Sequence, residues 1–373
     1  MEQSKKFFTF LMIFIQLLHT ITSSTNDVLR CTKVHNDNYY LGQVCILIDK
    51  QIDRSTDWNA QRVENNARPE QIRTVVFQES TVTYVPTQLF EKFTHVDRVY
   101  LNATELESID SDSFDRATNL KEIYLNQNKL AELGARSFSK AKACHILDLS
   151  QNKLQHLDDA AFEGLSSVRK LLLNLNRISS LSEDVFAPLI QLNHLDLSNN
   201  NIEMFADNVF EHNRALQFVD LSYNSIKVLN INLKNNPLLT KFHVSSNVIE
   251  NATILRKPNV TNSLVIYAED NNWQCDVLNA TAKELEPLNV RFTALQMERV
   301  IRENSFVNGI DCHATSFFDS ANVNWPIVAF VVTAAIVFII GAFVAIFCCR
   351  RRRRRGSWSS ATQSHATVIS ATS

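Results

Sequence analysis

Apolar residues recur at fixed positions through the middle of the chain, with a period of 24 residues. When residues 144–167 are written above residues 168–191, both segments carry apolar side chains at repeat positions 1, 4, 6, 11, 14 and 19. Asparagine stands at position 9 of both, as Asn152 and Asn176. A single repeat of this kind cannot bury its own apolar face, so it must stack on its neighbours. The pattern predicts a solenoid.

The period predicts about eight to nine repeats over residues 72–270. Seven begin 24 residues apart, at positions 72, 96, 120, 144, 168, 192 and 216, and two less regular ones begin at 239 and 264. Position 9 suits asparagine, because its amide can both donate to and accept from backbone groups where the strand ends. That position holds Ser80, Thr104, Asn128, Asn152, Asn176, Asn200, Asn224, Asn247 and Asn272. Position 19 predicts an aromatic row on the convex side, made of Phe90, Phe114, Phe138, Phe162, Phe186 and Phe210, then Leu233.

Each repeat is expected to contribute one strand to a parallel sheet on the concave face of a horseshoe, which makes the fold an α/β solenoid. Side chains alternate along a strand, so positions 4 and 6 point into the core and positions 3, 5 and 7 point out. In the ninth repeat this numbering sends Ile266 and Ala268 outwards. Cys144 takes a core position and is interpreted as a buried free thiol. Function therefore belongs to positions 3, 5 and 7, or to the loops.

Two sets of outward residues are candidates for ligand binding, because aromatic residues and arginine are enriched at interface hot spots. Arg98, Tyr100 and Tyr124 form the set nearer the N-terminus. The second set consists of Lys170, Leu172, His194 and Phe218. The alternative is that the concave face is simply solvated and that a ligand binds an edge or the convex loops.

Catalysis and metal binding find little support in the sequence. Asp148, Asp196 and Asp220 share position 5, but no clustered set of ligands surrounds them. No nucleophile–base pair and no phosphate-binding loop is recognisable. We therefore expect no enzyme activity, no metal and no cofactor.

Apolar segments flank the repeats. Residues 1–24 are typical of a signal peptide, with Lys5 and Lys6 before the apolar run Phe7–Leu18. After a stalk over residues 314–326, the uncharged residues 327–349 would span about 34 Å as a helix, enough to cross a bilayer. Six arginines at 350–355 follow and predict a cytoplasmic C-terminus. The expected topology is a single-pass type I protein of the plasma membrane, with the short tail 350–373 inside.

The net charge of the chain limits which class of ligand is expected. The chain carries a net charge of −2; without residues 1–24, which contribute +1, and the six arginines, −9 remains. An acidic ectodomain disfavours nucleic acid as a partner. Its 20% charged and 45% apolar residues are ordinary for an ordered protein.

The repeat pattern LxxLxLxxNxL resembles extracellular leucine-rich repeat proteins. In that setting Cys31 and Cys45 are expected to form a disulfide in an N-terminal cap, over residues 25–71. The stretch Asn272–Cys275 is similar to the start of a C-terminal cap over residues 271–313; such caps often read NxWxCxC, and Val277 stands at the second cysteine position. Cys312 is the remaining ectodomain partner for Cys275. Ser55–Gln71 is expected to be a loop, and Leu278–Arg302 one or two short helices.

A closer resemblance is to the leucine-rich immune proteins of mosquitoes. It is carried by the Cys31…Cys45 cap, by Arg73–Phe90 in the first repeat and by Asn272–Cys275. The resemblance implies innate immune recognition. The soluble members carry a coiled coil and a linking cysteine pair after the repeats, and this chain has neither. It therefore resembles a transmembrane subgroup, and the complement-like partners of the soluble members are not carried over.

Several positions predict modification. Asn102, Asn251, Asn259 and Asn279 each begin an N-glycosylation sequon. Cys348 and Cys349 at the membrane edge are candidates for palmitoylation, or are ordinary residues at the end of the span.

The sequence thus predicts a cell-surface receptor or co-receptor that binds a protein or a pathogen-surface ligand and signals through a lateral partner. The alternative is an adhesion protein that binds the same or a related chain on a neighbouring cell.

Overall fold

The computed structural model describes residues 28–29, 43–56, 62–63, 68–256, 263–285, 287, 289–293, 305–307 and 310–312. All of them belong to the first of two compact units, residues 1–314. The predicted signal peptide, stalk, membrane span and tail lie outside the described residues, as do Cys31, Asn259, Cys348 and Cys349. None of the helices within the described ranges is long and apolar enough to cross a lipid bilayer.

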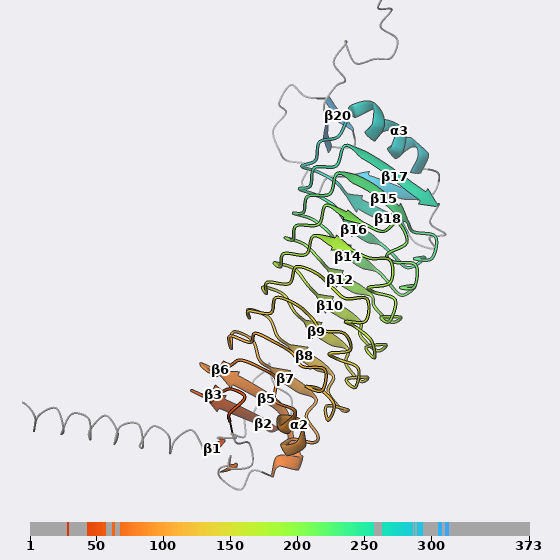
Figure 1. Ribbon diagram of the computed structural model, residues 1–373. Coiled ribbons are helices and arrows are strands. Elements are labelled where there is room, and N and C mark those ends of the chain that lie inside the picture. The colour runs from red at the N-terminus through yellow and green to blue at the C-terminus, as the bar shows by residue number, and fades with distance from the viewer. Residues whose placement is uncertain are drawn as a thin grey trace, which may run out of the picture. The chain divides into compact units, whose positions relative to one another are not determined.

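The described chain is a solenoid of about nine turns built on one parallel sheet, as the period predicts. Neighbouring strands pair in parallel from one end of the 11-stranded sheet to the other (Figure 1). Equivalent residues stand side by side, as Leu147, Leu171 and Leu195 do. In spatial order the strands are β2 (Gln43–Ile48), β5 (Ile72–Gln78), β7 (Arg98–Tyr100), β8 (Glu122–Tyr124), β9 (Ile146–Asp148), β10 (Lys170–Leu172), β12 (His194–Asp196), β14 (Phe218–Asp220), β16 (Lys241–His243), β18 (Leu264–Tyr267) and β19 (Val290–Thr293).

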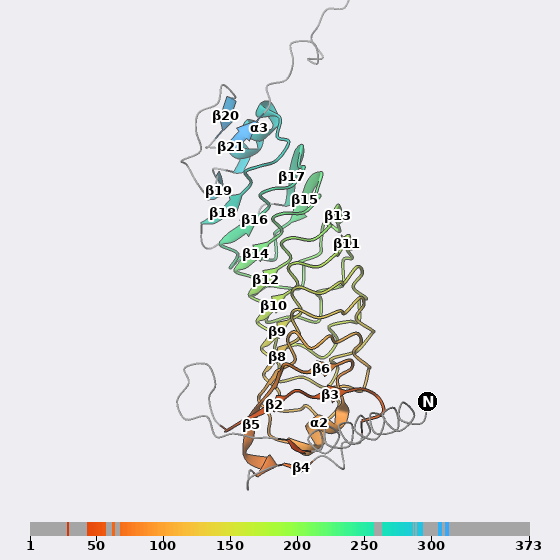
Figure 2. The ribbon, with the colours of Figure 1, turned by 90° about the vertical axis from the view of Figure 1, so that its left-hand side faces the viewer.

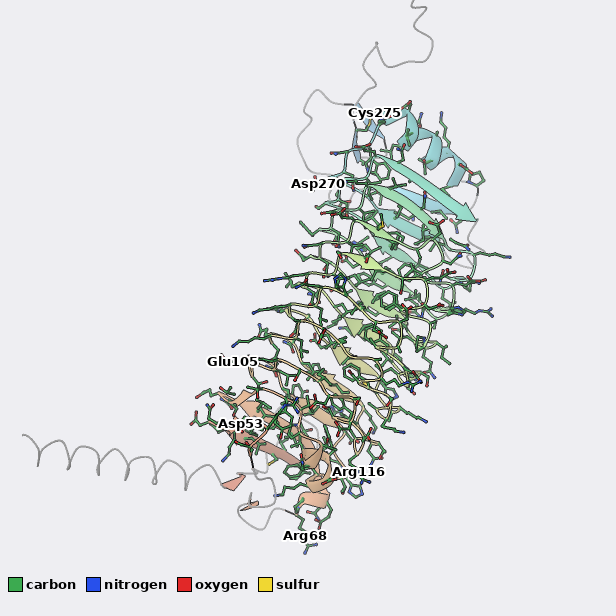
Figure 3. All side chains as sticks on the ribbon, viewed as in Figure 1. Asp53, Arg68, Glu105, Arg116, Asp270 and Cys275 are labelled. Carbon is green, nitrogen blue, oxygen red and sulfur yellow. A yellow bond between two sulfur atoms is a disulfide. The ribbon has the colours of Figure 1, made fainter. Side chains whose placement is uncertain are left out.

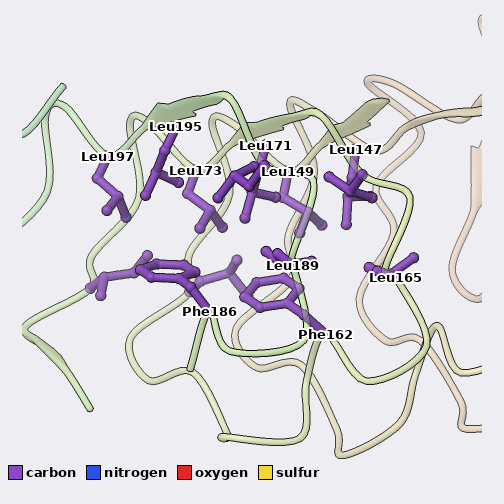
Figure 4. Packing of buried hydrophobic residues seen from close by; sticks show 14 of the residues in the cluster. Leu147, Leu149, Phe162, Leu165, Leu171, Leu173, Phe186, Leu189, Leu195 and Leu197 are labelled. Carbon is purple, nitrogen blue, oxygen red and sulfur yellow. The ribbon is translucent and has the colours of Figure 1, made fainter. Parts of the chain in front are cut away.

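The core lies between this sheet and the returning loops. Leucines from the strands and from the residues just after them, such as Leu171 and Leu173, project towards phenylalanines from the loops (Figure 4). The predicted row at position 19 is buried throughout. Ring centroids of Phe162 and Phe186 lie 6.1 Å apart, as do those of Phe186 and Phe210. Cys144 is buried in the same core as a free thiol, and burial raises its pKa to about 12.

Asparagines at position 9 bond to backbone groups, as the sequence predicts, and the structure adds that these bonds connect successive turns. The Asn176 Nδ2 donates to the carbonyl oxygens of Leu149 and Leu173, each at 3.0 Å. Its Oδ1 accepts from the backbone N–H of Leu154 at 3.0 Å. Each such side chain therefore stabilises its own turn and the preceding one.

Short elements complete the turns on the side opposite the large sheet (Figure 2). They include the helix α2 (Thr87–Lys92), whereas the 3-10 helix η1 (Pro69–Gln71) leads directly into β5. Three parallel strand pairs lie there: β3 (Gln51–Ile52) with β6 (Thr81–Val82), β11 (Ser180–Leu181) with β13 (Met204–Phe205), and β15 (Val228–Asn232) with β17 (Asn251–Arg256). At the N-terminal end, β1 (Val28–Leu29) pairs with β4 (Arg62–Val63). The segment 55–71, expected to be a loop, thus contains η1 and β4.

Both ends of the solenoid carry a cysteine. Cys45 is buried in β2 and is disulfide-bonded, but its expected partner Cys31 lies outside the described residues, so that pairing stays a prediction. At the other end the structure joins Cys275 to Cys312, with their Cα atoms 5.0 Å apart, which is the pairing that the sequence favours. Trp273 is fully buried there, and its indole N–H donates to the Ala268 carbonyl oxygen at 2.7 Å.

The C-terminal cap is only partly helical. The helix α3 (Cys275–Leu285) confirms one of the expected helices. It is followed by β19, a strand that the sequence did not predict and that extends the large sheet beyond β18. The hairpin β20 (Ser305–Val307) and β21 (Ile310–Cys312) then brings Cys312 back to α3.

The sequence-based numbering of the ninth repeat was wrong by one residue. Ile266 and Ala268, expected to point outwards, are both fully buried, and Val265 and Tyr267 point out instead. Asn271, not Asn272, makes the hydrogen bonds typical of position 9. The register explains the error, because Lys241 pairs with Val265, 24 residues on, whereas the numbering placed the ninth repeat 25 residues after the eighth.

Candidate protein-binding face

The outward side chains of β7 to β10, β12, β14, β16 and β18 form a continuous surface, here called the sheet face. Each of the three-residue strands from β7 to β14 buries its central residue and leaves the two outer residues half-buried. Parallel in-register pairing sets equivalent residues about 4.8 Å apart in neighbouring strands. Outward residues that are 24 apart in sequence therefore touch.

The first predicted patch comes together in the structure, but its members bind one another. The Arg98 guanidinium pairs with the Glu122 carboxylate at 3.0 Å. The Tyr124 hydroxyl donates to the other Glu122 oxygen at 3.1 Å, and the Tyr100 and Tyr124 rings stack with centroids 4.5 Å apart. Burial, and then the Glu122 charge, raise the pKa of Tyr124 well above its usual value. A ligand at this patch would have to compete with interactions that already satisfy it.

The second predicted patch is part of a longer array of rings. His194 and Phe218 stack with centroids 4.4 Å apart and an interplanar angle of 6°. Phe218 continues to His243 at 5.3 Å, and His243 to Tyr267 at 4.3 Å. These four residues, from four adjacent strands, are here called the aromatic stripe. Lys170 and Leu172 lie beside its first member, because β10 pairs with β12.

The aspartates of the sheet face cap the ends of their strands. The Oδ1 of Asp196 accepts from the Ser198 backbone N–H at 3.0 Å and from the Ser198 hydroxyl at 2.7 Å. Asp148 and Asp220 make the same pair of bonds to Ser150 and Ser222. Within the described residues, none of the three carboxylates forms an ion pair with a lysine or arginine. The same part of the chain holds no group of three metal-ligating side chains.

Both histidines of the stripe favour the neutral form. Burial is the main cause that lowers the pKa of His194, followed by the Lys170 charge, while Asp196 and Asp220 act in the opposite direction. Burial likewise lowers the pKa of His243, together with Lys241, against Asp220, Glu269 and Asp196. At neutral pH the stripe is therefore an uncharged set of rings beside carboxylates.

Three residues of the first patch and the aromatic stripe were missing from the predicted ligand-binding residues. Glu122 lies directly beside Arg98, and reading position 3 down successive repeats could have found that pair. His243 stands in the position-5 column and was not chosen, although His194 at position 3 was. Tyr267 was lost through the one-residue error in the ninth repeat.

The predicted glycosylation sites differ in exposure. Asn251 and Asn279 are exposed, the latter in α3, whereas Asn102 is half-buried just after β7. A glycan on Asn102 would stand next to the stacked pair of Tyr100 and Tyr124, and far along the sheet from the aromatic stripe. Glycosylation at these positions stays a prediction.

One edge of the sheet face has an unusual backbone. In each turn the residue before position 9 has a positive φ, such as 58° at Leu175 and 55° at Tyr223. These two bulky side chains are 46% and 60% exposed. Figure 3 shows Glu105 and Asp270, which also have positive φ, on the same edge of the solenoid.

Comparison with known sequences supports the reading of the repeats. A leucine rich repeat model matches residues 94–153 and 142–202. The chain therefore carries leucine-rich repeats in this region. Among curated proteins, none matches this chain in sequence.

Solved structures with matching chains include three insect immune assemblies or domains. A chain of the Drosophila Toll–Spatzle complex is 18% identical with a TM-score of 0.45, over 64% of this chain and 40% of that one. The leucine-rich repeat domain of APL1, a mosquito protein, gives 16% and 0.39, over 77% and 100%. The LRIM1/APL1C complex gives 14% and 0.40, over 90% and 80%. This chain spans less than half of the matched chain in the Toll complex.

Proposed function

We propose that this protein is a cell-surface receptor or co-receptor that binds a protein or pathogen-derived ligand through its sheet face. Its setting would be innate immunity, and it would signal through a lateral partner. The membrane anchor rests on the apolar residues 327–349 and the following arginines, and the immune setting rests on the resemblance of the cap and first-repeat stretches. A leucine-rich repeat frame is typically a scaffold for protein interaction rather than catalysis.

The observation that carries the binding role is an irregular surface on a regular frame. The inward positions are repetitive, with leucine, asparagine and phenylalanine recurring in most turns. The outward positions change from turn to turn and include four contacting rings that the core does not use. Aromatic side chains at the surface are enriched in interface hot spots. A solenoid whose inward residues repeat from turn to turn and whose outward residues vary suits recognition of a specific partner.

Proximity labelling tests this function. The full chain is expressed on insect cells with a peroxidase fused to the N-terminal side of the repeats, and labelled proteins are identified after exposure to haemolymph and bacteria. We expect a small set of labelled proteins, of which at least one binds the purified full chain directly. A variant in which the outward residues of the sheet face are exchanged among one another serves as the control. The receptor role fails if no labelled protein binds the purified chain.

Adhesion is tested in the same cells. If cells that express the chain aggregate with one another, while untransfected controls stay dispersed, the ligand is a second copy of this chain and the receptor role is replaced by adhesion. If aggregation needs a second cell type, the partner is a different surface protein.

A further inference from the structure

We propose that the aromatic stripe, together with the carboxylates of Asp196 and Asp220, is the docking site for a basic segment of a protein partner. Arginine or lysine side chains of that segment would lie over the rings and pair with the two carboxylates. The inference rests on the proposed binding function and assigns it a place and a chemistry.

The rings form one uninterrupted surface. Side chains from β12, β14, β16 and β18 form three successive ring contacts, with centroids 4.4, 5.3 and 4.3 Å apart. At about 4.8 Å per strand the stripe extends roughly 14 Å, the length of about four residues of extended chain. Rings held against one another keep their orientation, so little conformational entropy is lost when a partner binds.

The charges beside the rings favour a cationic partner. The carboxylates of Asp196, Asp220 and Glu269 act on the two histidines, against the ammonium groups of Lys170 and Lys241. With the imidazoles neutral, this neighbourhood has a net charge of −1. Asp196 and Asp220 each use Oδ1 to cap a serine, and within the described residues the Oδ2 of neither carboxylate forms a hydrogen bond or ion pair.

Stacked rings and carboxylates are complementary to the same kind of side chain. A guanidinium or ammonium group is attracted to the face of an aromatic ring, by about 0.5–2 kcal/mol depending on exposure. Arginine adds a planar fork that can pair with a carboxylate while it stacks. An anionic ligand would meet the carboxylates unfavourably. The chemistry of the site therefore points to an arginine-rich or lysine-rich segment.

The first patch differs from the aromatic stripe in that its carboxylate is already paired with a cation. There the Glu122 carboxylate is already paired with Arg98 and hydrogen-bonded to Tyr124. At the stripe the two nearby cations, Lys170 and Lys241, form no ion pair with Asp196 or Asp220 among the residues that the structure describes. Of the two aromatic clusters, the stripe is the one with unpaired negative charge to offer.

A labelled hexa-arginine peptide tests the site on the purified full chain, by fluorescence anisotropy at low and at physiological salt. The double variant Asp196→Asn/Asp220→Asn keeps the oxygen that caps Ser198 and Ser222 but removes both charges. We expect it to weaken binding about fivefold, in line with exposed charge pairs. Phe218→Leu should weaken binding about threefold to tenfold by removing one of the two inner rings.

Asp148→Asn is the matched control. Asp148 makes the same two bonds to Ser150 but lies on β9, outside the stripe. Its substitution should change binding less than twofold, and a hexa-glutamate peptide should not bind. Circular dichroism of each variant shows whether the fold is kept, and the two asparagine variants do not touch the core.

Two results would overturn the site. The first is an equal loss of binding in Asp148→Asn and in the double variant, which would mean attraction by overall charge alone. Equal binding of hexa-glutamate and hexa-arginine would also exclude it. If a partner found by proximity labelling binds all variants equally, the stripe is not the site but the receptor function stands. If no partner is found while hexa-arginine still needs the stripe, the site stands and the receptor function fails.

Discussion

Single residues at the end of each strand fix how one turn meets the next. An asparagine at position 9 bonds to carbonyl groups in two turns, and the residue before it adopts a positive φ. Left-handed backbone is unfavourable for most side chains and is best tolerated by glycine, asparagine and aspartate. The chain nevertheless places Leu175 and Tyr223 there, which shows that the turn geometry overrides local preference.

Asn176→Ala should lower the free energy of unfolding by about 2–4 kcal/mol, because it removes three buried hydrogen bonds and leaves the Leu154 N–H without a partner. The carbonyl oxygens of Leu149 and Leu173 still accept from Asn152 and Asn200. Asn174→Ala, on the half-buried sheet face, should change it by less than about 0.5 kcal/mol. Urea unfolding followed by circular dichroism measures both. Similar losses for the two variants would contradict the role given to position 9.

Asn199→Val tests the left-handed backbone. Asn199 is exposed and has a φ of 55°. A β-branched residue there should destabilise the fold by about 1–2 kcal/mol. Asn201→Val is the control, since Asn201 is also exposed but is not among the residues with positive φ. Thermal unfolding should separate the two variants, and an unchanged Asn199→Val midpoint would refute the strain argument.

At the scale of a single strand, the sequence-based numbering and the structure disagree. The ninth repeat was numbered one residue too late, and a shift of one residue in a strand exchanges its two faces. Here the shift decides whether Tyr267 points out to join His243 or points into the core. The register of this one strand therefore decides which residues make up the binding surface.

Ile266→Asp and Val265→Asp distinguish the two registers. Ile266 is fully buried in β18, so an aspartate there should cost more than about 3 kcal/mol or unfold the C-terminal turns. Val265 is half-buried on the sheet face, and its substitution should cost less than about 1 kcal/mol. Limited proteolysis near α3 reports local unfolding. Greater damage from Val265→Asp would restore the sequence-based numbering.

Residues that repeat could be predicted from the sequence, and residues that break the repeat could not. The burial of Phe186 and the role of Asn176 follow from a period that seven turns keep without error. The ninth turn offers two adjacent asparagines, 271 and 272, and either fits position 9 by type. Only the packing of Ile266 and Ala268 selects the first. The diagonal contact of Phe218 with His243 also crosses from position 3 to position 5, which column-by-column reading does not reveal.

At the scale of the whole molecule, stability is a sum over stacked turns, since each strand of the large sheet pairs with its immediate neighbours. Local changes at the sheet face thus act on a few turns at a time. Protonation is one such change, because the stripe contains two titratable rings from β12 and β16.

Acidification should destabilise the turns that carry the stripe. The pKa values of His194 and His243 lie below 6.5 in the folded state, so the unfolded chain binds more protons as pH falls through 6.5. The free energy of unfolding should therefore decrease between pH 7.5 and pH 5.5. Urea titrations at the two pH values measure it. A His194→Gln/His243→Gln variant should lose less stability over this window, and an equal loss would contradict the assignment.

The order of the strands also decides which turns would bear a mechanical load. A ligand held on β12 to β18 and pulled against an anchor beyond Cys312 would place tension on those turns and on the C-terminal cap. The covalent link between Cys275 and Cys312 closes that cap and limits how far it could extend. The turns from β2 to β10 lie on the other side of the attachment point and would carry no tension. The solenoid would then transmit force through its C-terminal turns alone and leave the remaining turns unstretched.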